Sequence, residues 1–225
     1  MQTEDTLFGR IANKFRPPNP SFHYSTKKIN ILINQYINQG KKVLDLGSGG
    51  RRLRNGIISL DIDKGVNVDI VANAEALPFR QNAFDFIICT AVLEHVADYR
   101  KAVFEMNRCL LNSGLIYVEV PFLQTYHAHP NDFRRFTLAG LEYLFRDYKK
   151  RDSGVCVGPF SILAWIFRKF PRFLFHNSIL GLGIEFIFGW LTFWIKYLDI
   201  IVPNAKRAHQ IASGIYFLGQ KSNTP

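Results

Sequence analysis

The chain has 225 residues, the length of one ordinary domain, and 48% of them are hydrophobic, which suffices for a sizeable core. Its formal net charge of +10 favours an anionic partner: nucleic acid, an acidic membrane surface or a phosphorylated substrate. The three cysteines stand far apart without a CxxC pair, so they support neither a disulfide framework nor a zinc site and indicate a reducing compartment.

The N-terminal part is predicted to be a loop followed by a helix. Residues 1–15 contain no apolar run long enough for a signal peptide, so we expect a cytoplasmic protein. Prolines break residues 15–24, which should be extended. The helix that follows is expected to begin with Ser25 as its cap, to bury one face at 3.6-residue spacing, and to end at Gly40.

Strands and helices alternate along the rest of the chain. A helix is predicted over 98–113, with Leu110 on its inner face and Gly114 past its end, and another begins at a capping Thr137. This alternation implies a mostly parallel sheet with helices on both faces, which binds ligands beyond the carboxyl ends of its strands. The predicted strands are 41–47, 56–63, 68–74, 83–92, 115–122, 150–158 and 212–220.

Glycines follow the first strand directly, in the sequence VLDLGSGG at 43–50. Gly47 and Gly49 allow a sharp turn and let a ligand touch the main chain. The pattern departs from the dinucleotide fingerprint G-x-G-x-x-G, because Arg52 stands at the sixth position. Asp45 repels phosphate but suits an ammonium or sulfonium group, and Asp61, ending the second strand, suits two ribose hydroxyls. Singly, each acid is better explained as a turn residue; together, in this order, they indicate a ligand site.

Residues 41–144 resemble the class I S-adenosylmethionine-dependent methyltransferases, in their small-molecule branch. VLDLGSGG is similar to the family's first, cofactor-binding motif and SLDID (59–63) to its second. ANAEALPF (72–79) is similar to the third motif and FDFIICTAVLEHV (84–96) to the fourth. The resemblance implies a Rossmann-like sheet of seven strands, S-adenosyl-L-methionine as cofactor and methyl transfer as the reaction. A nicotinamide-dependent reductase is disfavoured by Arg52 and by the NAEALPF segment.

The resemblance also assigns residues to the cofactor by position. The glycines would contact its methionine part, Asp61 its ribose and the third motif its adenine. Asn73 stands where the family usually has an acid, but its amide oxygen can still accept a hydrogen bond. The first crossover is also short, with little helix expected between Gly50 and Gly56. The predicted cofactor-binding residues are Asp45, Gly47, Ser48, Gly49, Asp61, Ile62, Asn73, Ala74, Glu75, Thr90 and Ala91.

The sequence indicates the methyl acceptor less clearly than the cofactor. The fourth motif lacks the Asn/Asp-Pro-Pro-aromatic signature of base methylation, and basic residues do not alternate with aromatic ones, so we expect no nucleic-acid partner. An alcohol acceptor needs a base to take its proton. His95 follows the fourth strand and is one candidate, although a helix-starting residue bonded to the backbone explains it equally well.

A second acceptor-side patch lies at 126–137, YHAHPNDFRRFT. His127 and His129 are candidate bases, while Asp132, Arg134 and Arg135 are candidate substrate-binding residues. We expect no metal here, because the patch lacks a further ligand. These residues suit a binding site for sugars or phosphorylated sugars. Similar segments occur in family members that resemble enzymes of polysaccharide or lipid-linked sugar synthesis. The simpler alternative is a turn in which Asp132 pairs with an arginine.

An apolar, aromatic insertion at 159–210 separates the last two strands. A single membrane span is excluded because the last strand must return to the same sheet, and a two-span hairpin is excluded because its first arm is too short. We expect amphipathic helices that lie in a membrane interface through 159–202, with the basic residues Arg168, Lys169 and Arg172 toward lipid head groups. An apolar lid and a dimer interface are equal alternatives.

We therefore predict one domain over 1–225: an N-terminal lid and helix (1–40), a cofactor-binding core (41–158), the insertion (159–210) and a last strand (211–220). The predicted activity is S-adenosylmethionine-dependent O-methylation of a sugar or lipid-linked saccharide, in polysaccharide biosynthesis. The expected location is the cytoplasm, with peripheral attachment to the inner face of the membrane. The oligomeric state is not predicted, and an oligomer is possible. The alternative is a non-catalytic scaffold of a membrane-associated synthesis complex.

Overall fold

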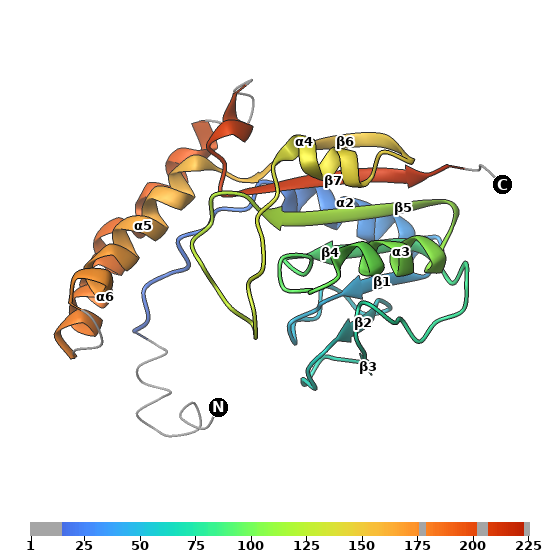
Figure 1. Ribbon diagram of the computed structural model, residues 1–225, viewed down its shortest axis with the longest axis horizontal. Coiled ribbons are helices and arrows are strands. Elements are labelled where there is room, and N and C mark those ends of the chain that lie inside the picture. The colour runs from blue at the N-terminus through green and yellow to red at the C-terminus, as the bar shows by residue number, and fades with distance from the viewer. Residues whose placement is uncertain (1–14, 176–178, 202–206, 223–225) are drawn as a thin grey trace.

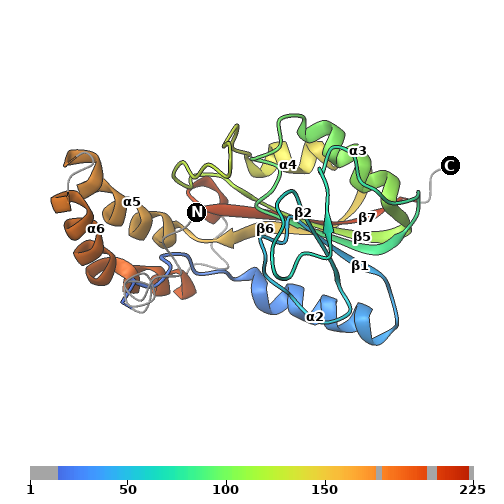
Figure 2. The ribbon, with the colours of Figure 1, turned by 90° about the horizontal axis from the view of Figure 1, so that it is seen from below.

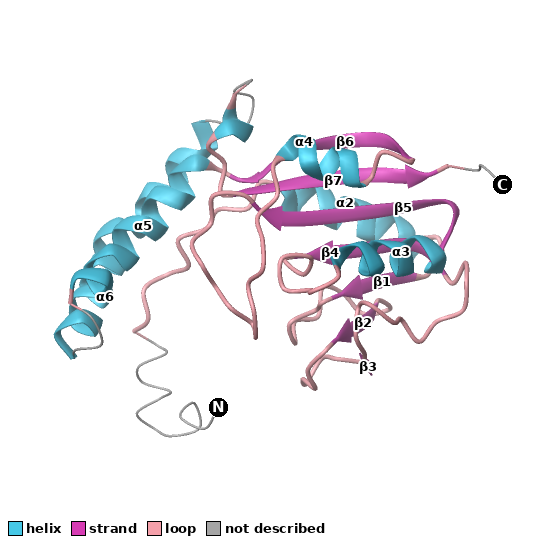
Figure 3. Cartoon of the chain, in the orientation of Figure 1, coloured by secondary structure: helices cyan, strands magenta, loops and turns pink. Residues whose placement is uncertain are grey.

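The computed structural model describes residues 15–175, 179–201 and 207–222. Their strands form one seven-stranded sheet in the order β3-β2-β1-β4-β5-β7-β6 (Figures 1 and 3). The strands β1 to β5 pair in parallel and β7 is antiparallel to both of its neighbours. This confirms the predicted fold class. The strands are β1 (Val43–Leu46), β2 (Ile58–Asp61), β3 (Ile70–Val71), β4 (Phe84–Thr90), β5 (Leu110–Pro121), β6 (Tyr148–Val157) and β7 (Gly214–Lys221).

Helices cover both faces of the sheet. Helix α2 (Ser25–Asn38) lies on one face, and α3 (Tyr99–Cys109) and α4 (Leu138–Leu144) lie on the other (Figure 2). The core is divided accordingly into two clusters, one under α2 around Ile33 and Phe86 and a larger one under α3 and α4. The carboxyl ends of β1, β2 and β4 meet at one edge, where loops rather than long helices follow them.

The predicted strands differ from the observed ones by a few residues at their ends, and two helix ends differ because of contacts with β5 or β4. Ser25 is the first residue of α2 rather than its cap, because its hydroxyl donates to the Glu119 carboxylate of β5. Helix α3 ends at Cys109, and the buried Leu110 instead begins β5 by pairing with Phe84. The predicted cap of α4 is confirmed, since the Thr137 hydroxyl accepts a hydrogen bond from the Gly140 N–H at 3.0 Å.

The insertion between β6 and β7 is helical. It comprises α5 (Pro159–Leu174), α6 (Ile179–Thr192) and the 3₁₀ helices η1 (Phe193–Ile201) and η2 (Ala208–Gln210). Helices α5 and α6 pack side by side as a hairpin that projects from the edge of the sheet (Figures 1 and 2). In the described part of the chain, no helix is both long and apolar enough to cross a membrane. Residues 176–178 and 202–206 of the predicted insertion lie outside the described residues.

The described N-terminal segment, residues 15–24, runs along this insertion. The Phe22 N–H donates to Ser161 Oγ, and the indole N–H groups of Trp165 and Trp190 donate to Ser21 Oγ and the Phe15 carbonyl. The segment therefore binds the hairpin, in place of the predicted lid over the ligand site; residues 1–14 of that prediction lie outside the described residues.

A buried carboxylate joins two helices of the insertion. Asp199 of η1 accepts hydrogen bonds from the N–H groups of Phe160 and Ser161, at 2.8 and 2.9 Å, and from Ser161 Oγ at 2.6 Å. These N–H groups belong to the first turn of α5, which has no partner for them within the helix. The Tyr24 hydroxyl donates to the backbone carbonyl of Asp199. Asp199 thus caps α5 from a distant part of the chain.

We expect Asp199→Ala to lower the free energy of unfolding by about 1–3 kcal/mol, because buried N–H groups lose their acceptor. Denaturant unfolding followed by circular dichroism measures the change. Asp147→Ala, at an exposed position before β6, is the matched control and should change stability little. Equal stability of the two variants would show that Asp199 does not anchor α5.

Candidate functional site

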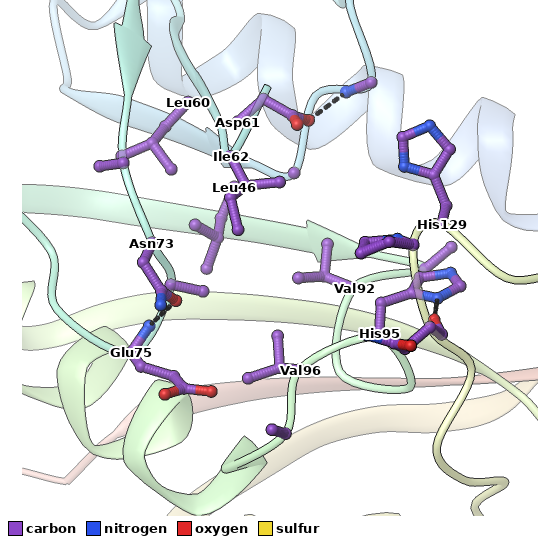
Figure 4. Close-up of a pocket in the computed structure, with 18 of the residues that line it drawn as sticks. Leu46, Leu60, Asp61, Ile62, Asn73, Glu75, Val92, His95, Val96 and His129 are labelled. Atoms are coloured by element: carbon purple, nitrogen blue, oxygen red, sulfur yellow. Dashed lines mark hydrogen bonds between the residues drawn. The ribbon is translucent and has the colours of Figure 1, made fainter. Parts of the chain in front are cut away.

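A cavity of about 490 Å³ lies beyond the carboxyl ends of β1, β2 and β4 (Figure 4). This volume is within the range of small-molecule sites. The turns after these strands form one part of its wall, and the loop after β5 forms the other. The lining residues are Leu46, Gly47, Gly49, Leu60, Asp61, Ile62, Ala72, Asn73, Ala74, Glu75, Ala91, Val92, His95, Val96, Ala97, His129, Pro130, Asn131 and Phe133.

The turn after β1 leaves no room for a side chain at position 47. The Gly47 φ of +74° is unfavourable for other residues, and a Cβ there would lie 2.1 Å from Cγ2 of Val92. Gly49 has a φ of +59°, and a Cβ there would meet nothing within 4 Å, so the turn borders open space. The Gly49 N–H donates to Oδ2 of Asp61 at 2.7 Å, which ties the turn after β1 to the end of β2.

Asp61 lies on the cavity wall with both oxygens engaged by the backbone. Oδ1 accepts from the Asp63 N–H at 3.1 Å, while Oδ2 accepts from Gly49. Each carboxylate oxygen has a second lone pair, so hydroxyl donors can still bind. Ile62 is 56% exposed beside it, an apolar surface that suits the flat face of a heterocycle. The wall from Asp61 to the third motif therefore fits a nucleoside such as the adenosine of S-adenosylmethionine.

Asn73, Ala74 and Glu75 line the cavity as a short turn. The Asn73 side-chain oxygen accepts a hydrogen bond from the Glu75 N–H at 2.9 Å (Figure 4). Glu75 Oε1 accepts from the Asp98 N–H at 3.0 Å. Both side chains thus already hold backbone groups and keep only part of their capacity for a ligand. Ala91 also lines the cavity, with a φ of +55°, a strained conformation that is common at functional sites.

Three predicted cofactor residues, Asp45, Ser48 and Thr90, do not line the cavity. The Thr90 hydroxyl accepts a hydrogen bond from Arg51, whose guanidinium also lies 3.6 Å from Oδ1 of Asp45. Asp45 and Ser48 are fully buried, and their side-chain oxygens have no hydrogen-bond partner among the described residues. Burial raises the pKa of Asp45 to about 6, against the opposing effect of Arg51.

Glu94, His95 and His127 form a cluster beside the end of the cavity where the methyl acceptor is expected. His95 Nε2 is 3.8 Å and His127 Nε2 is 3.7 Å from Oε1 of Glu94, and the two imidazole rings meet edge to face. Sequence reasoning missed Glu94, although it directly precedes His95 in the fourth motif. The signal was an acid flanked by apolar Leu93 and a candidate base, at a position that proves fully buried.

The three predicted histidines are therefore placed differently. His95 and His129 line the cavity (Figure 4), whereas His127 is half-buried and does not line it. The Glu94 carboxylate, with smaller contributions from the Thr125 carbonyl and Asp132, raises the pKa of His127 against the effect of burial.

The predicted substrate-binding residues are engaged within the protein, and none of them lines the cavity. Arg135 forms two hydrogen bonds with the Asp132 carboxylate and holds its pKa far below the usual range. Arg134 donates to the backbone carbonyls of Leu93, Val96 and Ala97. These contacts fix the loop after β5 over the turn after β4. The simpler alternative, a turn in which Asp132 pairs with an arginine, describes this patch.

Comparison with known proteins points to a methyltransferase domain, which agrees with a nucleoside-binding cavity at the carboxyl ends of the strands. Residues 44–118 match a family model described as a methyltransferase domain. An uncharacterised protein of Methanocaldococcus jannaschii is 36% identical over 107 residues, which cover 42% of this chain and 47% of that protein. A ubiquinone biosynthesis O-methyltransferase of Dechloromonas aromatica is 26% identical over 196 residues, covering 73% of this chain and 80% of that one.

Solved structures share the fold at low identity. A sarcosine dimethylglycine methyltransferase from Galdieria sulphuraria, described as putative, has a TM-score of 0.56 at 14% identity, covering 95% of this chain and 98% of that one. A Burkholderia thailandensis 1,6-didemethyltoxoflavin-N1-methyltransferase with bound S-adenosylhomocysteine has a TM-score of 0.51 at 14% identity, covering 89% and 80%. At this identity the likeness concerns the fold.

Asp45 should make stability depend on pH. Because its folded pKa is raised to about 6, the stability from its protonated form is complete below about pH 4 and is lost as pH rises through 6. Asp45→Asn should therefore raise the free energy of unfolding at pH 7 by about 3 kcal/mol, since two pKa units correspond to roughly that energy. Urea unfolding between pH 4 and 7.5 measures it.

The gain should shrink toward zero near pH 4. Asp63→Asn, at an exposed position, is the control and should show no such trend. A gain for Asp45→Asn that does not vary with pH would contradict the raised pKa.

Proposed function

We propose that this chain, which carries a class I S-adenosylmethionine-dependent methyltransferase domain, transfers a methyl group to a hydroxyl oxygen of a lipid-linked molecule. S-adenosylmethionine supplies, when bound, an electrophilic methyl group on a sulfonium sulfur. The observation that carries the proposal is the make-up of the cavity. Asp61 and Ile62 form an end suited to a nucleoside, and His95, His129 and Asn131 form a polar end suited to a hydroxyl group.

Each end of the cavity has a separate task. The glycine turn and Asp61 bind and orient the nucleoside, which lets the enzyme align two groups for a direct displacement. A hydroxyl acceptor must lose its proton on reaction, and imidazole groups are suited to accept it. The imidazoles of His95 and His129 lie at this end, and Phe133 and Pro130 add apolar surface against the body of the acceptor.

The surface of the insertion supports a lipid-linked acceptor. Large apolar side chains on α5, α6 and η1 are exposed, including Phe173 at 79% and Ile201 at 79%. Among the charged residues, Glu185 is buried and pairs with the exposed Lys169 at 2.8 Å and the exposed Arg172 at 3.4 Å. An exposed apolar surface of this kind indicates a lipid or protein partner.

This arrangement changes the predicted membrane contact. Lys169 and Arg172 are exposed but pair with Glu185, and Arg168 donates to the Pro18 carbonyl, so part of the charge of the basic cluster is compensated within the protein. No described residue of the insertion lines the cavity, which argues against a lid. We therefore infer a contact with membranes that depends on apolar insertion rather than on anionic lipids.

Two lipid-linked acceptors are compatible with this site. A saccharide hydroxyl suits the polar groups at the acceptor end. A phenolic hydroxyl of a quinone precursor is the second candidate, favoured by the similarity to the ubiquinone biosynthesis O-methyltransferase of Dechloromonas aromatica. Methyl-labelled S-adenosylmethionine incubated with host membrane lipids distinguishes them. Label that mild acid releases as a methylated sugar supports the saccharide, and label retained on an aromatic lipid supports the quinone precursor.

We expect wild-type protein to bind S-adenosylmethionine and S-adenosylhomocysteine but not NADH in calorimetric titrations. Asp61→Ala should weaken binding by at least about tenfold, because one carboxylate hydrogen bond contributes roughly 1.5–3 kcal/mol. Asp63→Ala is the control and should bind like wild type. Unchanged affinity in Asp61→Ala would remove Asp61 from the site, and failure of the wild type to bind would favour the non-catalytic scaffold.

Wild-type protein should sediment with neutral phosphatidylcholine vesicles and remain bound at high salt, because apolar contact is not screened by ions. Phe170→Glu combined with Phe173→Glu should release it, since both side chains are exposed on α5. Phe104→Glu, 64% exposed on α3, is the matched control and should still sediment. Protein that stays in solution, and forms a dimer that the double variant dissociates, would identify a self-association surface instead.

A further inference from the structure

We propose that Glu94, His95 and His127 bind a divalent transition-metal ion at the acceptor end of the cavity. The binding site itself follows from the geometry of these three residues. Its role in catalysis, given below, rests on the proposed function.

The three side chains bring potential ligand atoms together. One carboxylate oxygen of Glu94 and the Nε2 atoms of His95 and His127 all lie within 4.8 Å of one another. The two Nε2–Oε1 distances are 3.8 and 3.7 Å. Metal–ligand bonds of about 2.0–2.2 Å place neighbouring ligand atoms roughly 3–4 Å apart, so an ion fits between these atoms with small adjustments.

Hydrogen bonds on the far side of each ring orient the lone pairs. His95 Nδ1 lies 2.5 Å from the Asn131 carbonyl oxygen, and His127 Nδ1 lies 2.9 Å from the Thr125 carbonyl oxygen. A carbonyl only accepts, so each Nδ1 carries a proton, and the Nε2 atom on the side of Glu94 is the one available to an ion. Histidines that bind metals almost always donate their other N–H group in this way.

Glu94 needs a cation. Its carboxylate is fully buried, and neither oxygen has a hydrogen-bond partner in the described part of the chain. Burying a carboxylate without a hydrogen bond costs several kcal/mol, which a bound ion offsets. The nearby Arg135 cation does not meet this need, because it is paired with Asp132.

A shared proton explains the cluster less well than a metal. A proton bridging Glu94 and either histidine requires a separation of about 2.7–3.2 Å, and both distances exceed that range. Two imidazole nitrogens and one carboxylate are a donor set that suits zinc and its neighbours in the first transition series. Three protein ligands also leave a coordination position for a further molecule, as in catalytic rather than structural zinc sites.

The ion would activate the acceptor of the proposed methyl transfer. His95 lines the cavity, so an acceptor hydroxyl can reach the open position. Coordination lowers the pKa of the hydroxyl group. Its O–H bond would then break, with the proton released to solvent. The electron pair left on the oxygen would form the new O–CH3 bond while the methyl–sulfur bond of S-adenosylmethionine breaks, and that bond's electron pair would stay on the sulfur of the leaving S-adenosylhomocysteine.

Calorimetric titration of untagged, chelator-treated protein with zinc chloride tests the binding site, and cobalt(II) absorption reports the coordination. We expect one equivalent to bind. Glu94→Gln and His127→Asn should each weaken binding by at least about 100-fold, the upper end of the loss seen when second-shell partners of a metal are removed. His209→Asn, on η2 outside the cluster, is the control and should bind like wild type. Circular dichroism verifies that each variant is folded.

Absence of zinc binding by the wild type, or binding that both variants retain, would overturn the metal site. S-adenosylmethionine binding to the same protein separates this outcome from failure of the proposed function. Cofactor binding without zinc binding leaves the methyltransferase and removes the metal. Zinc binding without cofactor binding supports the metal site and contradicts the proposed function.

Discussion

The contact between Gly47 and Val92 is the constraint on which the cavity depends. The Gly47 N–H donates to the Leu60 carbonyl of β2, while its α-carbon packs against the side chain that follows β4. One residue thus joins the carboxyl ends of three neighbouring strands. A side chain at this position would collide with Val92, and the positive φ would be strained as well. Asp61 and Ala91 are placed by this arrangement, because they follow β2 and β4 at the same edge.

Two buried carboxylates flank this turn region without hydrogen-bond partners among the described residues. Asp45 belongs to β1 and Glu94 follows β4. Groups of this kind lower stability, and proteins keep them mainly where a ligand or a reaction needs them. Their surroundings differ: the Arg51 guanidinium lies 3.6 Å from Asp45, whereas Glu94 faces two imidazoles and is the proposed ligand of a metal ion.

The insertion shows a different division of polar and apolar groups. Surface helices commonly expose charges and bury apolar residues, but here Glu185 is buried beneath two exposed basic partners and large aromatic residues are exposed. Asp199 joins η1 to α5, and the segment 15–24 contacts both the hairpin and β6. An apolar hairpin placed in this way would bring a membrane, and the proposed lipid-linked acceptor within it, toward the cavity.

The sequence by itself determined the sheet, the glycine turn, the position of Asp61 and the cap at Thr137. These features follow from local rules: apolar periodicity sets strands and helices, and turn chemistry depends on neighbouring residues. It also placed Gly49, Ala74 and His129 at what became the cavity wall.

The tertiary structure alone decided which polar groups meet. The approach of His127 to Glu94, the hydrogen bonds of Arg134 to three carbonyls and the ion pair of Lys169 with Glu185 each join segments whose distance in space no local pattern encodes. The hydroxyl of Ser25 likewise donates to Glu119 on a distant strand instead of capping its own helix. Side-chain partners depend on how loops and layers pack, because a hydrogen bond or ion pair needs contact within a few ångströms.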